Sequence, residues 1–96
     1  MSVENPLNDE TRRRRILFRA THMGTYENDI LVGGFVRARL AAFTLEELDA
    51  VEAVMDIPDV LLADWLTGRA PIPETHDGPI LRAMRAAAEA GEGRPR

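Results

Sequence analysis

The sequence predicts an all-α protein that folds as a single compact bundle of five helices. Apolar residues recur at helical spacing along most of the chain, and no run of β-branched residues alternates with polar ones as in a strand. Glycine and proline divide the chain into five such segments. With 96 residues, the chain suffices for one domain and not for two. We therefore expect a helical domain over residues 1–90 and a disordered tail over residues 91–96.

The first helix is expected to begin near Asn8, whose side chain can cap a helix N-terminus. Asp9 and Glu10 would then lie in the first turn, where the helix dipole favours negative charge. Gly24 is the expected end, because a glycine just past a helix adopts positive φ without steric cost. The inward face would consist of Ile16, Leu17 and Ala20.

The second helix is expected over residues 26–41 and contains two consecutive glycines, Gly33 and Gly34. Each glycine inside a helix costs about 1 kcal/mol relative to alanine. We therefore expect some compensation: the close approach of another helix, a kink, or a division into two shorter helices. The apolar side of this helix would consist of Ile30, Leu31, Phe35 and Ala38.

The third helix has a clear start signal, a capping box in which Thr44 precedes Glu47 by three residues. The sequence Asp56-Ile57-Pro58 is expected to end it. Between these limits, residues follow at helical spacing: Leu45, Leu48, Glu52 and Met55, with Val51 beside them.

Two shorter helices are expected to complete the bundle. Pro58 would open the fourth, since the first turn of a helix tolerates a missing N–H, and Gly68 would stop it. The segment Asp77-Gly78-Pro79 would start the fifth. The residues expected to face inward are Leu61, Leu62, Trp65 and Leu66 in the fourth helix, and Ile80, Leu81 and Met84 in the fifth.

The sequence contains no set of residues in a pattern typical of a catalytic or metal-binding site. The chain has no cysteine and a single serine, Ser2, which excludes thiolate sites, disulfides and a serine triad. His22 and His76 do not occur in a metal-ligand spacing. Two positions apart on a helix, Glu27 and Asp29 diverge and cannot act as a carboxylate pair on one substrate. We predict that the protein is not an enzyme and has no catalytic residues and no metal site.

Charge is unevenly distributed along the chain, whose net charge is −4. Residues 12–39 contain seven arginines and two acidic residues, whereas residues 44–77 contain nine acidic residues and one arginine. The two regions could pair internally or orient a partner. The run Arg12–Arg15 could contact nucleic acid, but the acidic total and the few aromatic residues favour a solvated helix face with one arginine folded over the core.

The segment of residues 18–35 is the most informative part of the chain. It joins a basic helix end, Gly24, and an acidic helix start that contains Glu27. A glycine leaves a spot without a side chain, where another backbone could approach closely. A plain turn between two helices, with a capped start, would produce the same pattern. The residues alone leave both interpretations open.

This segment resembles the succinate dehydrogenase assembly factor family, which carries an Arg-Gly-x-x-Glu motif between its first two helices. Gly24, Glu27 and the following Asp29 match that motif, whereas Met23 stands where the family has arginine and Tyr26 replaces a common basic residue. The resemblance extends over roughly residues 12–84. The other matching residues are Phe18-Arg19, Leu31, Gly33 and Phe35, then Asp56-Ile57-Pro58-Asp59 and Trp65-Leu66.

The resemblance implies a protein that docks on the flavoprotein subunit of succinate dehydrogenase, or of fumarate reductase, and promotes covalent attachment of FAD to a histidine of that partner. It implies no stably bound cofactor here. The partner-binding residues would be Arg19, His22, Met23, Gly24, Tyr26, Glu27 and Asp29. Because Met23 and Tyr26 remove two cations, a divergent member that binds another protein is an alternative. A small nucleic-acid-binding regulator is a second alternative.

The last predictions from the sequence concern the localisation and the oligomeric state of the protein. No apolar run approaches the roughly 20 residues that a membrane-spanning helix needs. The first ten residues are polar and include three acidic ones, unlike a signal or transit peptide. We expect a protein without membrane or nucleic-acid contacts, monomeric when free. We place it in the cytoplasm, or in the mitochondrial matrix if the source is eukaryotic.

Overall fold

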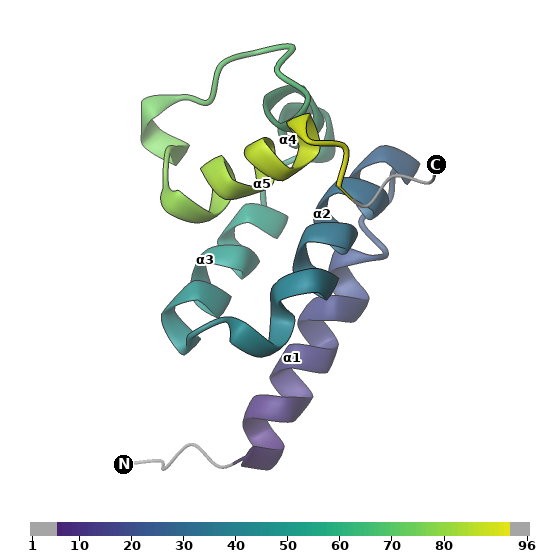
Figure 1. The fold of residues 1–96 in the computed structure, drawn as a ribbon, viewed down its shortest axis with the longest axis vertical. Coiled ribbons are helices and arrows are strands. Elements are labelled where there is room, and N and C mark those ends of the chain that lie inside the picture. The colour runs from purple at the N-terminus through teal and green to yellow at the C-terminus, as the bar shows by residue number, and fades with distance from the viewer. Residues whose placement is uncertain (1–5, 93–96) are drawn as a thin grey trace.

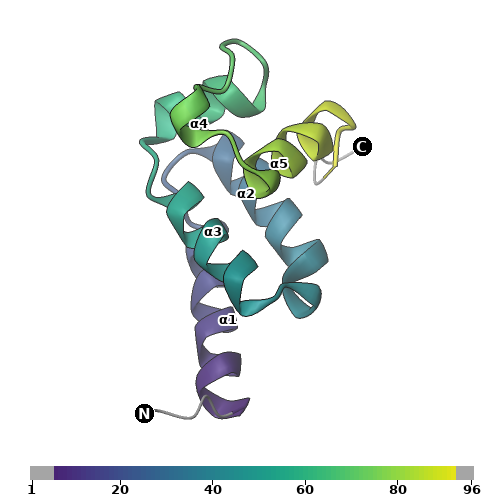
Figure 2. The same ribbon diagram turned by 90° about the vertical axis from the view of Figure 1, so that its left-hand side faces the viewer.

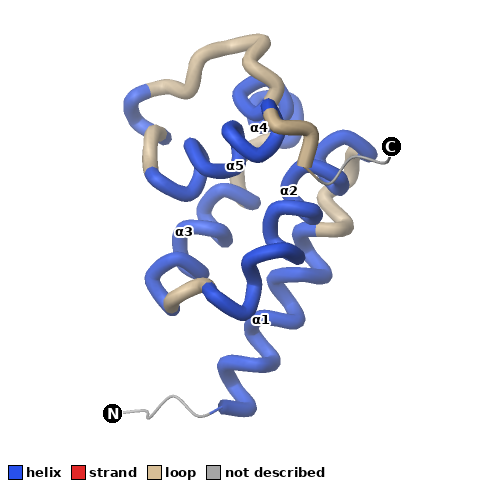
Figure 3. Tube along the Cα trace, in the orientation of Figure 1, coloured by secondary structure: helices blue, strands red, loops and turns tan. Residues whose placement is uncertain are grey.

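Five α-helices follow one another in the computed structural model, which describes residues 6–92 and the side chains of residues 9–92. Two short 3-10 helices, η1 (Leu40–Ala42) and η2 (Glu74–His76), lie between them, and residues 6–92 contain no strand (Figure 3). The α-helices are α1 (Pro6–Ala20), α2 (Tyr26–Arg39), α3 (Leu45–Met55), α4 (Asp59–Leu66) and α5 (Pro79–Glu89). The predicted all-α, five-helix fold is confirmed.

The helices are arranged around a hairpin of α1 and α2. α1 packs against α2 and α3, while α5 lies across α2, α3 and α4 (Figure 1). The N-terminal half of α1 projects beyond the other helices (Figures 1 and 2), which accounts for the long principal extent of 43 Å against 33 and 21 Å. The turn between α1 and α2 lies at the other end of α1, close to the start of α4.

α2 runs through both glycines without a break, so the expected kink or division does not occur. An added Cβ at Gly33 would lie 3.0 Å from Thr21 Cγ2 and 3.1 Å from the carbonyl oxygen of Ala20. The end of α1 therefore approaches α2 where the side chain is missing. This close approach, one of the compensations expected from the sequence, offsets the cost of glycine within the helix.

Local signals set the ends of the later helices largely as predicted. Thr44 Oγ1 accepts the N–H of Glu47 at 3.1 Å, and Glu47 Oε1 accepts the N–H of Thr44 at 2.9 Å, which completes the capping box. Gly68, with φ +78°, follows the C-cap of α4. The N–H groups of Gly91 and Glu92 bond to carbonyls of Ala88 and Ala87, a Schellman cap on α5. Residues 91–92 of the expected tail thus complete a helix end, and residues 93–96 lie outside the described range.

Several expectations about helix ends and faces are wrong. α1 already begins at Pro6, so Asn8 lies within its first turn. α1 ends at Ala20 rather than at Gly24, because the Thr21 hydroxyl bonds to the carbonyls of Leu17 and Phe18 at 3.0 and 3.1 Å and terminates the helix. Two residues expected to face inward, Ala38 and Leu61, are exposed.

The core forms from apolar residues of all five helices. In α2 the buried face passes through Val32 and Val36 as well as Leu31 and Phe35, so Ala38 falls outside it. In α4 it passes through Leu62, Trp65 and Leu66, which turns Leu61 outward. The remaining large buried side chains of the core are Ile16, Phe43, Leu48, Val51, Val54, Met55, Ile57, Ile80, Leu81 and Met84.

The basic and acidic regions pair with each other within the fold. Arg12 bonds to Asp49 and Glu52 of α3, each at 2.5 Å, and these hydrogen bonds, Glu52 first, raise the pKa of the Arg12 guanidinium. Arg13 reaches back over the core to the carbonyls of Leu40 and Phe43 at 2.6 and 2.9 Å. Arg12 and Arg13 of the arginine run therefore hold α1 to its neighbours, whereas Arg14 pairs with Glu10 within α1, and both Arg14 and Arg15 are exposed.

Across residues 6–92, every helix is too short or too polar to cross a lipid bilayer.

Candidate docking surface

The α1–α2 turn, residues 21–25, carries the glycine of the family motif and is braced from within. The N–H of Met23 donates to Asp29 Oδ1 at 2.5 Å, so a side chain of the first turn of α2 closes the loop. Thr25 caps α2 by accepting the N–H of Asn28 at 3.2 Å. Gly24 has φ +114°, in the region that favours glycine.

The first turn of α4 supports this turn from the side. Asp59 Oδ2 lies 3.0 Å from the position that a Cβ on Gly24 would take. The fully buried Asn28 donates from Nδ2 to the carbonyl oxygen of Asp59 at 3.0 Å. These two contacts fix the first turn of α4, which also carries the exposed Val60, against the start of α2.

We call the exposed region around this turn the turn surface. It consists of residues 21–25 with Phe18, Arg19, Tyr26, Glu27 and Val60. Three of these side chains are apolar or aromatic and strongly exposed: 64% for Phe18, 76% for Tyr26 and 73% for Val60. Clustered exposed apolar side chains are typical of a binding surface.

The charged members of the turn surface are held by partners at the surface. Arg19 Nη2 lies 2.5 Å from Asp56 Oδ1, in the link between α3 and α4. Glu27 Oε1 lies 3.2 Å from Arg69 Nη2, and Arg69 Nε also bonds to Asp64 at 3.0 Å. Hydrogen bonds to Asp64 and then to Glu27 raise the pKa of the Arg69 guanidinium. Exposed pairs of this kind are weak and can exchange for contacts to a partner.

His22 lies over Phe18 at the end of α1, with ring centroids 4.0 Å apart and planes inclined by 15°. Its Nδ1 is 2.7 Å from the carbonyl oxygen of Phe18. Since a carbonyl only accepts, Nδ1 donates, and Nε2 of the neutral ring is left as an acceptor at the surface. The stacked pair thus offers one flat apolar face with one polar edge.

The structure therefore divides the seven predicted binding residues into two groups. Arg19, His22, Tyr26 and Glu27 present their side chains on the turn surface. Met23 and Asp29 are partly buried: Met23 packs against the core and Asp29 closes the turn. Gly24 itself is exposed, but its conformation and its contact with Asp59 give it a role within the turn.

Two contributors were missed by sequence reasoning. Val60 lies in an unbroken apolar run, Val60-Leu61-Leu62-Ala63, where helical spacing alone does not show which side chain faces outward. Asn28 is fully buried, although asparagine side chains usually lie at the protein surface. Its position directly after Glu27 in the motif was the only signal available.

The described side chains, residues 9–92, include no group of three or more acidic or histidine residues placed to hold a metal ion.

The chain is similar to proteins of one known family. A family model described as the flavinator of succinate dehydrogenase matches residues 14–88. The chain belongs to this family. The match includes the α1–α2 turn, the first turn of α4 and most of α5, and so contains the whole turn surface.

Individual relatives cover most of the chain. FAD assembly factor SdhE of Acetobacter pasteurianus is 53% identical over 73 residues, which are 76% of this chain and 67% of that protein. Succinate dehydrogenase assembly factor 2-A, mitochondrial, of Drosophila ananassae is 31% identical over 80 residues, 79% of this chain and 50% of that protein. Succinate dehydrogenase assembly factor 2, mitochondrial, of Yarrowia lipolytica is 31% identical over 84 residues. That match covers 83% of this chain and 58% of the Yarrowia protein. The chain thus spans between half and about two thirds of the length of these relatives. No solved structure matches it.

Proposed function

We propose that this protein docks through the turn surface on the flavoprotein subunit of succinate dehydrogenase and promotes covalent attachment of FAD to that subunit. The observation that carries the proposal is the turn of the family motif, braced from inside by Asp29 and Asp59 while Phe18, Tyr26 and Val60 face outward. The names of the relatives, FAD assembly factor and succinate dehydrogenase assembly factor, support the same partner.

In this role the chain acts by positioning. The FAD remains on the flavoprotein, whose own histidine forms the bond, and this chain binds no cofactor stably. Docking would hold the flavin domain of the partner in the arrangement in which histidine and flavin meet. Fixing two groups in a reactive arrangement removes entropy that the reaction would otherwise have to lose.

Tyr26 suits a docking surface even though the family commonly has a cation there, whereas Met23, which replaces the motif arginine, packs against the core. Tyrosine is enriched in protein interfaces because its ring offers apolar area and its hydroxyl a hydrogen bond. Arg19, near the end of α1, keeps one cation on the turn surface. The partner contact of this chain is therefore expected to be more apolar and less dependent on salt than one based on the motif arginine.

Co-expression tests the proposal. The flavoprotein subunit from the same genome is produced with and without this chain, in a host that lacks its own assembly factor. After a denaturing gel, flavin fluorescence on the subunit band reports covalent FAD. We expect fluorescence that depends on this chain. Equal fluorescence in both lanes, with the chain folded and present, would contradict the proposal and favour a different protein partner.

A matched pair of variants links the effect to the turn surface. Val60→Asp places a charge within the exposed apolar group and should reduce the fluorescence severalfold, since an unpaired charge buried in an interface is costly. Ala86→Asp makes a comparable change at an exposed position of α5 outside that surface and should leave the fluorescence unchanged. Circular dichroism shows whether both variants keep the native helix content.

A further inference from the structure

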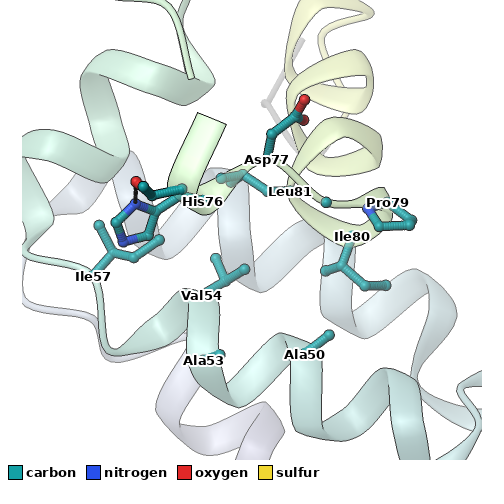
Figure 4. Close-up of a pocket in the computed structure, with 11 residues that line it drawn as sticks. Ala50, Ala53, Val54, Ile57, His76, Asp77, Pro79, Ile80 and Leu81 are labelled. Atoms are coloured by element: carbon teal, nitrogen blue, oxygen red, sulfur yellow. Dashed lines mark hydrogen bonds between the residues drawn. The ribbon is translucent and has the colours of Figure 1, made fainter. Parts of the chain in front are cut away.

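A groove lies between the second half of α3 and the start of α5. Its α3 side is formed by Ala50, Ala53 and Val54, Ile57 follows at one end, and Pro79 and Ile80 form the opposite wall (Figure 4). Its volume is about 270 Å³. Because a cavity of about 150 Å³ accepts a benzene-sized molecule, the groove has room for a large aliphatic or aromatic side chain.

Small side chains keep this groove open. Ala50 and Ala53 lie three residues apart on the same side of α3, toward α5 (Figure 4). At the far end, His76 lies near Ile57 in the figure, and its ring is 5.1 Å from that of the buried Trp65. The walls are therefore anchored in the core, which makes the groove a preformed feature of the surface.

The charged residues that line the groove are all acidic. A second hollow continues it toward the start of α3 and shares Ala50, Pro79 and Ile80 with it. Of the residues described along both hollows, those charged at neutral pH are Glu46, Glu47 and Asp77, with no arginine among them. Asp77 is paired with Arg82 at 2.6 Å, whereas Glu46 is fully exposed at the rim. An apolar floor with an acidic rim is complementary to an apolar segment that carries basic residues.

The groove and the turn surface border the same short segment, the link between α3 and α4. Ile57 at the end of the groove follows Asp56, which pairs with Arg19 of the turn surface, and lies two residues before Asp59, whose carboxylate lies beside Gly24. A partner that covers this link would contact both surfaces.

We propose that the α3–α5 groove binds a second segment of the same flavoprotein subunit, one that inserts a large apolar side chain over Ala53 and carries arginine or lysine beside it. The inference rests on the proposed function and adds to it a second point of contact. The flavoprotein segment pairs with Glu46 and Glu47 at the rim while its apolar side chain fills the floor. Two linked contacts raise the affinity beyond that of either surface alone.

Binding of the full chain to the purified flavoprotein subunit, measured by calorimetry, tests this inference. Ala53→Trp fills the groove from an exposed position and should raise the Kd about tenfold or more. Glu46→Arg reverses the rim charge and should raise it about threefold to tenfold, with a weaker salt dependence. Ala86→Trp and Glu89→Arg make the same changes on α5 outside the groove and should leave the Kd unchanged.

A photo-reactive benzoyl-phenylalanine provides a direct readout. Placed at position 53 it should cross-link to a flavoprotein segment that contains a basic residue, identified by mass spectrometry, whereas at position 86 it should not. If the native chain binds and both Ala53→Trp and Glu46→Arg bind equally well, the groove inference is overturned while the proposed function stands. If the native chain does not bind the flavoprotein at all, the proposed function fails and the groove inference fails with it.

Discussion

Gly24 belongs to the family motif, and its backbone conformation allows the α1–α2 turn to form. Its φ of +114° lies where L-residues with a side chain are strained, and the carboxylate of Asp59 occupies the space that a Cβ would approach. Asp29 supports the same turn by accepting the N–H of Met23. The turn thus keeps its shape before a partner arrives, which reduces the entropy lost on binding.

Replacing Gly24 by alanine should therefore lower the free energy of unfolding by about 1–3 kcal/mol. Both the strained φ and the contact with Asp59 Oδ2 at 3.0 Å contribute to this cost. Urea denaturation followed by circular dichroism measures it. Gly78→Ala is the comparison, because Gly78 has an extended φ of −158° and nothing lies within 4 Å of an added Cβ. Gly78 is the N-cap of α5, where alanine is less favourable than glycine, so this variant should show a loss that is real but smaller. Equal losses in the two variants would show that the turn imposes no special conformation on Gly24.

The structure adds contacts within the chain to the partner-binding roles predicted for the motif residues, which stay predictions. Gly24 was predicted to allow another backbone to approach closely, and the carboxylate of Asp59 lies next to it in this chain. Asp29 was predicted to contact the partner, and its carboxylate closes the turn. Such assignments depend on contacts between residues about 30 positions apart, such as Asn28 with Asp59, and one sequence does not contain them.

At the scale of helices, the contact between α1 and α2 depends on Gly33. The Ala20 carbonyl oxygen and Thr21 Cα would lie 3.1 and 3.3 Å from an added Cβ. Both are backbone atoms, so they can move away only if the whole end of α1 shifts. The α1–α2 turn begins at Thr21, and any such shift would reach the turn surface.

Gly33→Ala should for this reason destabilise the protein, although alanine raises helix propensity by about 1 kcal/mol. We expect a net loss of about 1–3 kcal/mol from overpacking, measured by thermal and urea denaturation. Ala38→Gly at an exposed position of the same helix isolates the propensity effect and should cost about 1 kcal/mol. A gain in stability for Gly33→Ala, equal in size to that cost, would mean that the close approach is unimportant.

Helix starts and stops were the most predictable part of the fold. The Thr44–Glu47 capping box, Pro58 before α4 and Gly68 after it act through atoms a few residues away, so a local pattern identifies them. The predicted inward orientation of Leu61 was wrong because Leu61 lies in the unbroken apolar run of residues 60–63. The predicted inward orientation of Ala38, which lies between Arg37 and Arg39, was wrong as well. At both positions the arrangement of neighbouring helices, and not the spacing, decides which residues become buried.

At the scale of the whole molecule, ion pairs join segments that are distant in sequence. Arg12 bonds to α3, Arg19 to the α3–α4 link, and Arg69 to Glu27 of α2. The sequence left open whether its basic and acidic regions pair internally or steer a partner, and the structure shows the internal pairing. The acidic residues Glu46 and Glu47 lie outside this network of ion pairs in the described part of the chain. Glu46 is exposed, which leaves its charge available at the groove, whereas Glu47 also accepts the N–H of Thr44 in the capping box.

The salt bridge between Arg39 and Glu92 joins the end of α2 to the C-terminal cap of α5. The Arg39 guanidinium also lies 4.1 Å from the centre of the Phe35 ring, so one side chain connects the C-terminal cap to the core. Its hydrogen bond holds the pKa of the Glu92 carboxyl below the ordinary value of 4.5. Because the folded-state pKa is lowered, the pair stabilises the protein fully above that ordinary value, and the contribution disappears as the pH falls through the lowered pKa.

Glu92→Gln should accordingly reduce the free energy of unfolding at pH 7 by about 0.2–1 kcal/mol, the range for partly exposed pairs. At a pH below the lowered pKa, both proteins carry a neutral side chain at position 92 and the difference should vanish, provided that urea titration at both pH values starts from folded protein. At neutral pH the difference should also shrink in high salt, because salt screens exposed charges. Glu89→Gln, at the exposed last residue of α5, removes a carboxylate outside this pair and is the control. The Schellman hydrogen bonds use only backbone groups and therefore remain in the Glu92→Gln variant. A loss of stability that is the same at both pH values would mean that the Glu92 side chain stabilises the cap by packing and not by its charge.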